Sequence, residues 1–255
     1  SCVLDNGFAA VVEVPGFNYR THRYVEAYEK LPQNLVLGSE TSSTVSSRGV
    51  YKFPVEKKAD ALYDDHQSSS YDLEYCSWSN IPDEDFVLAD DYDWTLGQFV
   101  WTGFDYLGEP SPYDTDAWPN HSSMFGIIDL ASIPKDRYYL YKSIWNRDEA
   151  TLHILPHWNW KGREGEVTPV FVYTSYPSAE LFINGKSQGK RTKNNNSLTE
   201  RYRLMWMDVR YEPGEVKVVA YDENGNKAEE KVVRTAGKPH RIELIPDRDA
   251  LSADG

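Results

Sequence analysis

The sequence predicts an α/β unit followed by an all-β unit, and two patterns carry this division. In the first 150 residues, apolar strand-like runs and a helical stretch follow one another as strand, helix and strand, which favours parallel pairing through a crossover. After about Ala150, short alternating strands are separated by turn signals such as Asn184-Gly185 and Glu223-Asn224-Gly225. Regular short strands of this kind are typical of a β-sandwich, and we expect an immunoglobulin-like sandwich over 151–237.

The individual elements of the first unit follow from apolar periodicity and from turn residues. They are a strand at 9–14, a helix at 22–30, a strand at 34–40, a long polar segment at 41–92, a buried strand at 96–101 and a closing helix at 134–145. A polar segment as long as 41–92 is usually functional in a compact domain. Beyond the sandwich, the run 240–245 predicts a new strand, so we expect 238–255 to begin a further, truncated sandwich domain.

Composition excludes several classes of partner. The 255 residues contain 27 Lys and Arg against 40 Asp and Glu, and the resulting charge of −13 repels nucleic acid and anionic membrane surfaces. No apolar run is long enough for a membrane span, and neither a leader nor a full set of metal ligands is evident. Both ends interrupt a pattern, so we expect them to be cut boundaries, and the compartment stays open. Cys2 and Cys76 allow one disulfide at most.

Aromatic residues are abundant, with 8 Trp and 18 Tyr in the chain. Exposed aromatic rings can stack on the apolar faces of sugars, although core packing accounts for them equally well. One acidic residue also stands out by position. Glu40 directly follows an apolar strand and a Gly-Ser pair, where a parallel barrel would present its side chain at the functional carboxyl-terminal face. Without further information, a helix cap or a solvated surface residue is the commoner role for such a glutamate.

Three segments resemble the sixth, seventh and eighth strand ends of glycoside hydrolase family 2 barrels, and they occur in the right order. They are Gly16-Phe17-Asn18-Tyr19-Arg20, Gly38-Ser39-Glu40-Thr41 and the run from Phe99 to Pro110, FVWTGFDYLGEP. The likeness extends through Phe125-Gly126-Ile127-Ile128-Asp129, and the Leu181 to Lys186 hairpin resembles the domain that follows the barrel in bacterial β-galactosidases. The resemblance implies that 1–150 is the C-terminal part of a (β/α)8 TIM barrel.

The resemblance also implies roles for individual residues. Glu40 would be the nucleophile that forms a covalent glycosyl-enzyme, and Tyr19 would donate a hydrogen bond that orients its charged carboxylate. Trp101 would form the floor of the sugar subsite by stacking on galactose. Residues expected to border that subsite are Asn18, Asp105 and Glu109. No cofactor and no metal are implied.

The sequence departs from the family pattern in one respect. The acid/base glutamate of the family lies in an Asn-Glu pair after the fourth barrel strand, and no such pair occurs in residues 1–150. Retaining hydrolysis needs two carboxyl groups, one to attack and one to protonate the leaving oxygen. We therefore expect the chain to be inactive alone and to need the remainder of the full-length enzyme as its partner. The exposed edges of a part-barrel would also favour homo-oligomers.

The resemblance favours a β-galactosidase that cleaves terminal β-galactosides. A β-glucuronidase would need cations for the substrate carboxylate, but no Lys or Arg occurs between Trp101 and Asp129, where Glu109, Asp114 and Asp116 make the chain acidic. A β-mannosidase stays open, because the residues that read the axial hydroxyl lie largely elsewhere in the family. For a bacterial glycan-degrading enzyme, a periplasmic or extracellular location is expected.

A different class of function also stays open. The chain could be a non-catalytic carbohydrate-binding module whose ligand face is formed by Trp158, Trp160 and Trp206 of the sandwich. The competing interpretation is that these three tryptophans pack against the first unit.

Overall fold

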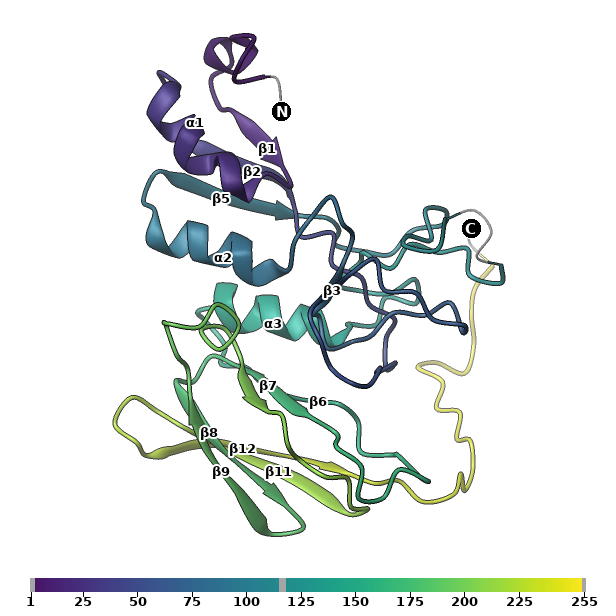
Figure 1. The fold of residues 1–255 in the computed structure, drawn as a ribbon. Helices are drawn as coiled ribbons and strands as arrows, with labels where there is room; N and C mark the ends of the chain where they lie inside the picture. Colours follow the sequence, from purple (N-terminus) through teal and green to yellow (C-terminus); the bar gives the residue numbers. More distant parts are fainter. Residues whose placement is uncertain (1–2, 115–117, 254–255) are drawn as a thin grey trace.

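A parallel three-stranded sheet organises the first part of the chain in this computed structural model, which describes residues 3–114 and 118–253 (Figure 1). Its strands are β1 (Gly16–Asn18), β2 (Val36–Thr41) and β5 (Thr95–Val100), in the order β1-β2-β5. Both pairings are parallel, which confirms the predicted crossover.

Two helices pack against this sheet. The 3₁₀ turn η2 (Thr21–Arg23) leads into α1 (Tyr24–Lys30), and α2 (Pro82–Asp91) contacts both β2 and β5. Tyr24 and Ala27 of α1 are buried in a small core with Phe17 and Val36 of the sheet. This burial fixes α1 between β1 and β2 in the way that parallel connections require.

Two parts of the first unit differ from the sequence prediction. The expected strand 9–14 is wrong, because the structure has a 3₁₀ helix, η1 (Phe8–Val11), and the strand β1 starts only at Gly16, where pairing with β2 begins. The polar segment 41–92 is not all loop. It contains the short parallel pair β3 (Lys58–Ala59) and β4 (Glu74–Tyr75), followed by the ten-residue helix α2.

The second part is built from two antiparallel sheets, as Figure 1 shows at the lower side of the molecule. One sheet has the order β10-β7-β6 and the other β12-β11-β8-β9. The bounds are β6 (Leu152–Leu155), β7 (Val170–Thr174), β8 (Ser178–Ile183), β9 (Lys186–Thr192), β10 (Leu204–Trp206), β11 (Glu215–Tyr221) and β12 (Lys227–Arg234). Apolar side chains from both sheets form one core between them, as expected for a sandwich.

Strand β7 is buried at every position because it contributes to two cores. Val170 and Val172 point into the sandwich, whereas Phe171 and Tyr173 pack on the opposite side with Tyr71 and other residues of the first part. Helix α3 (Asp136–Trp145) contacts β6 and β7 and lies between the two parts in Figure 1. The two parts are therefore joined by a shared apolar core.

The predicted strand at 240–245 is not formed in this structure. Residues 238–253 carry no strand, and the side chains of Ile242, Leu244 and Ile245 are more than four-fifths exposed. Strands need partners for their backbone groups, and no described strand pairs with this segment. The domain boundaries at 150 and 237 stay predictions.

Candidate active site

The carboxyl ends of the three parallel strands bring the principal predicted residues together. Tyr19 follows the end of β1, Glu40 lies one residue before the end of β2, and Trp101 follows the end of β5. The backbone links them in a row, because Tyr19 N donates to Glu40 O at 3.0 Å and Trp101 N donates to Thr41 O at 2.9 Å. The edge of the sheet therefore presents a carboxylate between a phenol and an indole.

The Tyr19 hydroxyl donates a hydrogen bond to Glu40 Oε2 at 2.9 Å. Burial raises the pKa of Tyr19 well above its ordinary value, and the neighbouring Glu40 carboxylate raises it further. The phenol is thus a permanent donor at any physiological pH. Beside this pair, Ser39 Oγ donates to Asn18 Oδ1 at 2.7 Å, so the Asn18 side chain is tied to β2 at the same edge.

The chain that follows Glu40 is fixed from several directions. Residues 41–46 are all buried, although five of them are Thr or Ser, and such groups need hydrogen-bond partners. Thr41 Oγ1 donates to Gln98 Oε1 at 2.8 Å, and Ser42 Oγ donates to Asp85 Oδ2 at 2.5 Å. Asp85 also accepts from Asn80 Nδ2 at 2.6 Å. The polar partners on β5 and α2 thereby hold the strand end that carries Glu40.

Trp101 is half-buried and packs against a small apolar cluster that includes Val45, Met124 and Phe125. Its ring meets that of Tyr106 edge-on, with centroids 6.0 Å apart and planes at 79°. This contact leaves one ring partly accessible next to the Glu40 edge, which is the arrangement that stacking on a sugar needs. The peptide bond between Trp101 and Thr102 is cis.

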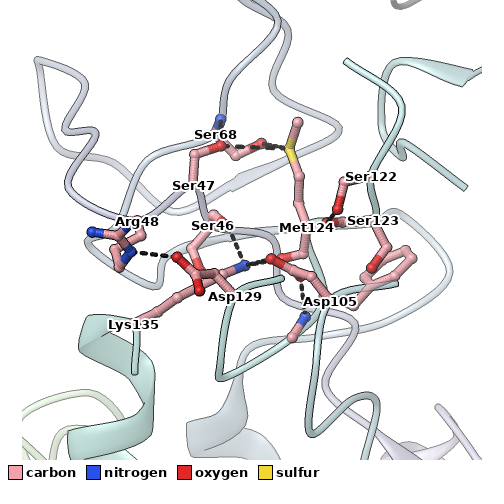
Figure 2. A network of polar contacts seen from close by, with 12 residues as sticks. Ser46, Ser47, Arg48, Ser68, Asp105, Ser122, Ser123, Met124, Asp129 and Lys135 are labelled. Atoms are coloured by element: carbon pink, nitrogen blue, oxygen red, sulfur yellow. Dashed lines mark hydrogen bonds and ion pairs between the residues drawn. The ribbon is translucent and has the colours of Figure 1, made fainter. Parts of the chain in front are cut away.

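The other two predicted subsite residues have different surroundings. Asp105 is almost fully buried and forms an ion pair with Lys135 Nζ at 2.7 Å, while its Oδ1 accepts from Gly126 N at 2.8 Å (Figure 2). Glu109 is exposed and accepts a hydrogen bond from the Tyr106 hydroxyl. Neither shares a hydrogen bond or an ion pair with Tyr19 or Glu40, so the structure does not bring them into that cluster.

Several supporting residues carry no recognisable signal in the sequence. Lys135 and Arg137 stand at the start of α3, where basic residues are normally solvated, yet both are buried. The Arg137 guanidinium donates to the backbone oxygens of Thr44, Phe125 and Gly126, and Lys135 Nζ donates to Ser46 O at 2.7 Å. Burial lowers the pKa of Lys135 to about 8 against the opposing effect of Asp105. These cations join the strand-end segments to α3.

The remaining predictions concern the cysteines, Asp116 and the tryptophans of the sandwich. Cys76 is buried, whereas Cys2 and Asp116 lie outside the described residues. Trp158 and Trp206 are buried in the sandwich core, and Trp160 packs on Tyr51 and Phe53, so the exposed ligand face expected for a binding module is not formed.

Within residues 3–114 and 118–253, no group of three His, Cys, Asp or Glu could hold a metal ion. None of the helices described there has both the length and the apolar character to cross a membrane.

Comparison with known proteins identifies relatives along the whole chain. A family model described as a domain of unknown function, DUF4982, matches residues 165–229. Beta-galactosidase BoGH2A of Bacteroides ovatus is 41% identical over 255 residues, which cover 97% of this chain and 29% of that protein. A putative beta-glucuronidase of Formosa agariphila is 36% identical over 153 residues, which cover 60% of this chain and 14% of that protein.

Solved structures agree with these relatives. A beta-glycosidase from Bacteroides vulgatus aligns with a TM-score of 0.74 at 28% identity, over 96% of this chain and 33% of that one. A glycosyl hydrolase family 2 member from Bacteroides cellulosilyticus aligns with a TM-score of 0.71 at 25% identity, over 98% of this chain and 31% of that one. Along nearly its whole length the chain is similar to members of glycoside hydrolase family 2, and it spans about a third of the length of these relatives.

Proposed function

We propose that this chain is the part of a retaining β-galactosidase that carries the catalytic nucleophile, Glu40. The observation that supports this most directly is the hydrogen bond from Tyr19 to the Glu40 carboxylate at the carboxyl ends of parallel strands. Within a barrel of eight such strands, built from this chain and the remainder of the enzyme, that edge is where active sites occur.

The proposed chemistry assigns one role to each residue. Glu40 attacks the anomeric carbon to give a covalent glycosyl-enzyme, which water then hydrolyses. Tyr19 holds the attacking oxygens in one orientation, and the Trp101 ring stacks on the apolar face of the sugar. The carboxylic acid that protonates the leaving oxygen is proposed to come from the remainder of the enzyme, about 5 to 5.5 Å from Glu40 as in other retaining glycosidases.

A neutral sugar is the proposed substrate. A glucuronide carries a carboxylate that calls for cations, and the chain from Trp101 to Asp129 has no Lys or Arg. Because some relatives are named beta-glucuronidase, hydrolysis of β-glucuronides is the alternative proposal. Turnover of aryl β-galactoside and aryl β-glucuronide by the full-length enzyme separates the two, and a kcat/KM that favours the glucuronide would reverse the assignment of the sugar.

The nucleophile is tested by covalent trapping in the full-length enzyme. Incubation with an activated 2-deoxy-2-fluoro-galactoside should label a peptide that contains Glu40, because the fluorine slows hydrolysis of the glycosyl-enzyme. The variant Glu40→Gln should not be labelled, while Glu109→Gln, which changes an exposed carboxylate outside the Tyr19 and Glu40 cluster, should be labelled normally. Label on a residue other than Glu40 would disprove the assignment.

We further propose that the chain alone does not hydrolyse natural β-galactosides. General acid help is worth roughly 10²- to 10⁴-fold, and without it the leaving alkoxide must depart unaided. Purified chain should therefore be inactive on lactose, whereas an aryl galactoside with a good leaving group is the most sensitive probe of residual attack by Glu40. Turnover of lactose would show that this chain contains a second catalytic carboxyl group.

A further inference from the structure

A polar pocket of about 310 Å³ opens between three loops of the first part of the chain. It is lined by residues that follow β2, by residues 65–67, and by the segment that leads toward α3. Glu40, Tyr19 and Trp101 are not among its lining residues. Its volume falls at the lower end of the range for small-molecule sites. Figure 2 shows lining residues of the first and third of these loops, including Ser46, Ser122 and Ser123.

The charges in the pocket are already balanced. Two carboxylates line it, and each has its own lysine: Asp105 pairs with Lys135 at 2.7 Å, and Asp65 pairs with Lys52 at 2.5 Å. No Lys or Arg is among the lining residues. An anionic ligand would find no uncompensated cation, and a cationic ligand would have to compete with both lysines. The pocket therefore suits a neutral ligand.

The remaining polar lining is rich in hydroxyl and amide groups, which can both donate and accept hydrogen bonds. It includes Ser46, Ser47, Gln67, Asn120, Ser122 and Ser123. Ser46 is only 1% exposed, and its Oγ has no hydrogen-bond partner among the described residues. A buried hydroxyl without a partner is costly, so this atom is a ready contact for a ligand hydroxyl.

The loop that carries residues 65–67 is held in place before any ligand arrives. The Tyr113 hydroxyl donates to Gln67 O at 2.8 Å and accepts from Tyr63 N at 3.1 Å. The Asn120 amide donates to His66 O at 3.2 Å, which joins this loop to the opposite wall. Such bracing lowers the entropy that a ligand must otherwise overcome to order its site.

An exposed aromatic residue directly adjoins the lining of the pocket in the chain. Trp118 directly precedes the lining residue Pro119, and its side chain is 78% exposed. Its ring stacks with that of His121 at a centroid distance of 5.9 Å and an interplanar angle of 27°. A large exposed indole next to a hydroxyl-rich pocket is the combination that recognises a sugar, whose ring has apolar C–H faces and a polar rim.

We propose that this pocket, with Trp118 next to its lining residue Pro119, binds a neutral saccharide unit as a second sugar site in addition to the one at Glu40. The proposal rests on the proposed function, because a protein that acts on glycans encounters neutral saccharides. Its test uses binding to this chain alone, so it can fail while the proposed hydrolase function stands.

The experiment measures the Kd of lactose and xylobiose, two neutral disaccharides, by isothermal titration calorimetry with the purified chain. Trp118→Ala should weaken binding by roughly tenfold, the order expected when one stacked ring is lost. Ser46→Ala should weaken it by about two- to tenfold without loss of thermal stability, because that hydroxyl has no protein partner to lose. Trp145→Ala, which removes a partly exposed indole outside both the pocket and the Glu40 edge, should leave the Kd within about twofold.

Three results would overturn the second site. One is binding that disappears in Trp101→Ala and persists in Trp118→Ala, which would assign the sugar to the Glu40 edge and leave the proposed function intact. Another is the absence of heat with both disaccharides at millimolar concentration. The third is tighter binding of free glucuronate than of lactose, since the charge balance argues against an anion. Circular dichroism of each variant establishes that it is folded before its Kd is compared.

Discussion

Tyr19 shows how the geometry of one residue can fix the position of the proposed nucleophile, Glu40. Its backbone φ of 54° is left-handed, a region that non-glycine residues seldom adopt. In that conformation both its N–H and its hydroxyl reach Glu40, one at the backbone and one at the carboxylate. Two contacts from one residue restrict the carboxylate more than either would alone.

We expect Tyr19→Phe to lower kcat/KM of the full-length enzyme by about 10- to 100-fold. A hydrogen bond to a charged group is worth about 1.5–3 kcal/mol, and here its loss would free the Glu40 carboxylate, the proposed nucleophile. Because Tyr19 titrates far above neutrality, the loss should be the same from pH 5 to 8. Steady-state kinetics checks both points.

The matched control for Tyr19 is Tyr221→Phe, which removes another tyrosine–glutamate hydrogen bond, to Glu180 in the sandwich at 3.2 Å. It should leave kcat/KM unchanged. Equal losses in the two variants would mean that the Tyr19 hydroxyl has only a general structural role.

At the residue scale, the sequence could predict the position of a side chain that depends only on where a strand ends. Glu40 and Trp101 directly end apolar runs, so their place at the sheet edge follows from strand boundaries alone. The buried partners could not be predicted in this way. Lys135 looks like a surface residue at a helix start, and only the arrangement of three distant loops shows that it neutralises Asp105.

Elements were predictable when their apolar pattern was regular and long enough. Strands β2 and β5 and helices α1 and α3 follow such patterns. Helix α2 does not, because three of its first four residues are acidic. Two of these, Asp83 and Asp85, are nevertheless buried, where polar groups contact them. Pro82 at its first turn, followed by acidic residues, is a helix-start signal that could have revealed it. Hydrogen bonds to residues far away in the sequence therefore hold the first turn of α2 in place.

The long segment between β5 and α3 needs a glycine at position 126. A Cβ on Gly126 would lie 2.1 Å from Asp105 N and 2.5 Å from Ile128 O, and backbone atoms cannot move aside cheaply. We expect Gly126→Ala to reduce the free energy of unfolding by about 3 kcal/mol or more, at or above the upper end of overpacking costs. Urea denaturation followed by tryptophan fluorescence measures the change.

Gly103 provides the internal control in the same pair of segments. A Cβ at Gly103 meets nothing within 4 Å, so Gly103→Ala should change stability by less than about 1 kcal/mol. If the two alanine variants were equally stable, the close approach of 105 and 126 would not be a determinant of the fold.

At the scale of the whole molecule, the two parts behave as one packing unit. Tyr71 of the first part donates its hydroxyl to Pro169 O at 2.7 Å, and the Tyr173 hydroxyl donates to Asp72 Oδ2 at 2.8 Å. Burial raises the pKa of Asp72 to about 7. Its protonated form is therefore favoured by folding, and its contribution to stability is lost as the pH rises toward and through 7. The sequence could not predict this, because each partner lies about a hundred residues from the other.

The strongest test of this union is the ion pair between Arg203 of the sandwich and Asp83 at the start of α2, both fully buried. We expect Arg203→Met to lower the free energy of unfolding by about 3–5 kcal/mol at pH 8, since it leaves the Asp83 carboxylate buried without its cation. Burial already raises the pKa of Asp83, and the variant should raise it further, so protonation at lower pH should restore part of the stability. The deficit should thus be smaller at pH 5 than at pH 8.

Two further variants serve as controls. Asp83→Asn combined with Arg203→Met should recover much of the loss, whereas Arg201→Ala, which breaks a more exposed pair with Asp91, should cost about 1 kcal/mol or less. Urea titrations at the two pH values measure all four proteins, and a deficit that is the same at pH 5 and pH 8 would contradict a buried unpaired carboxylate as its cause.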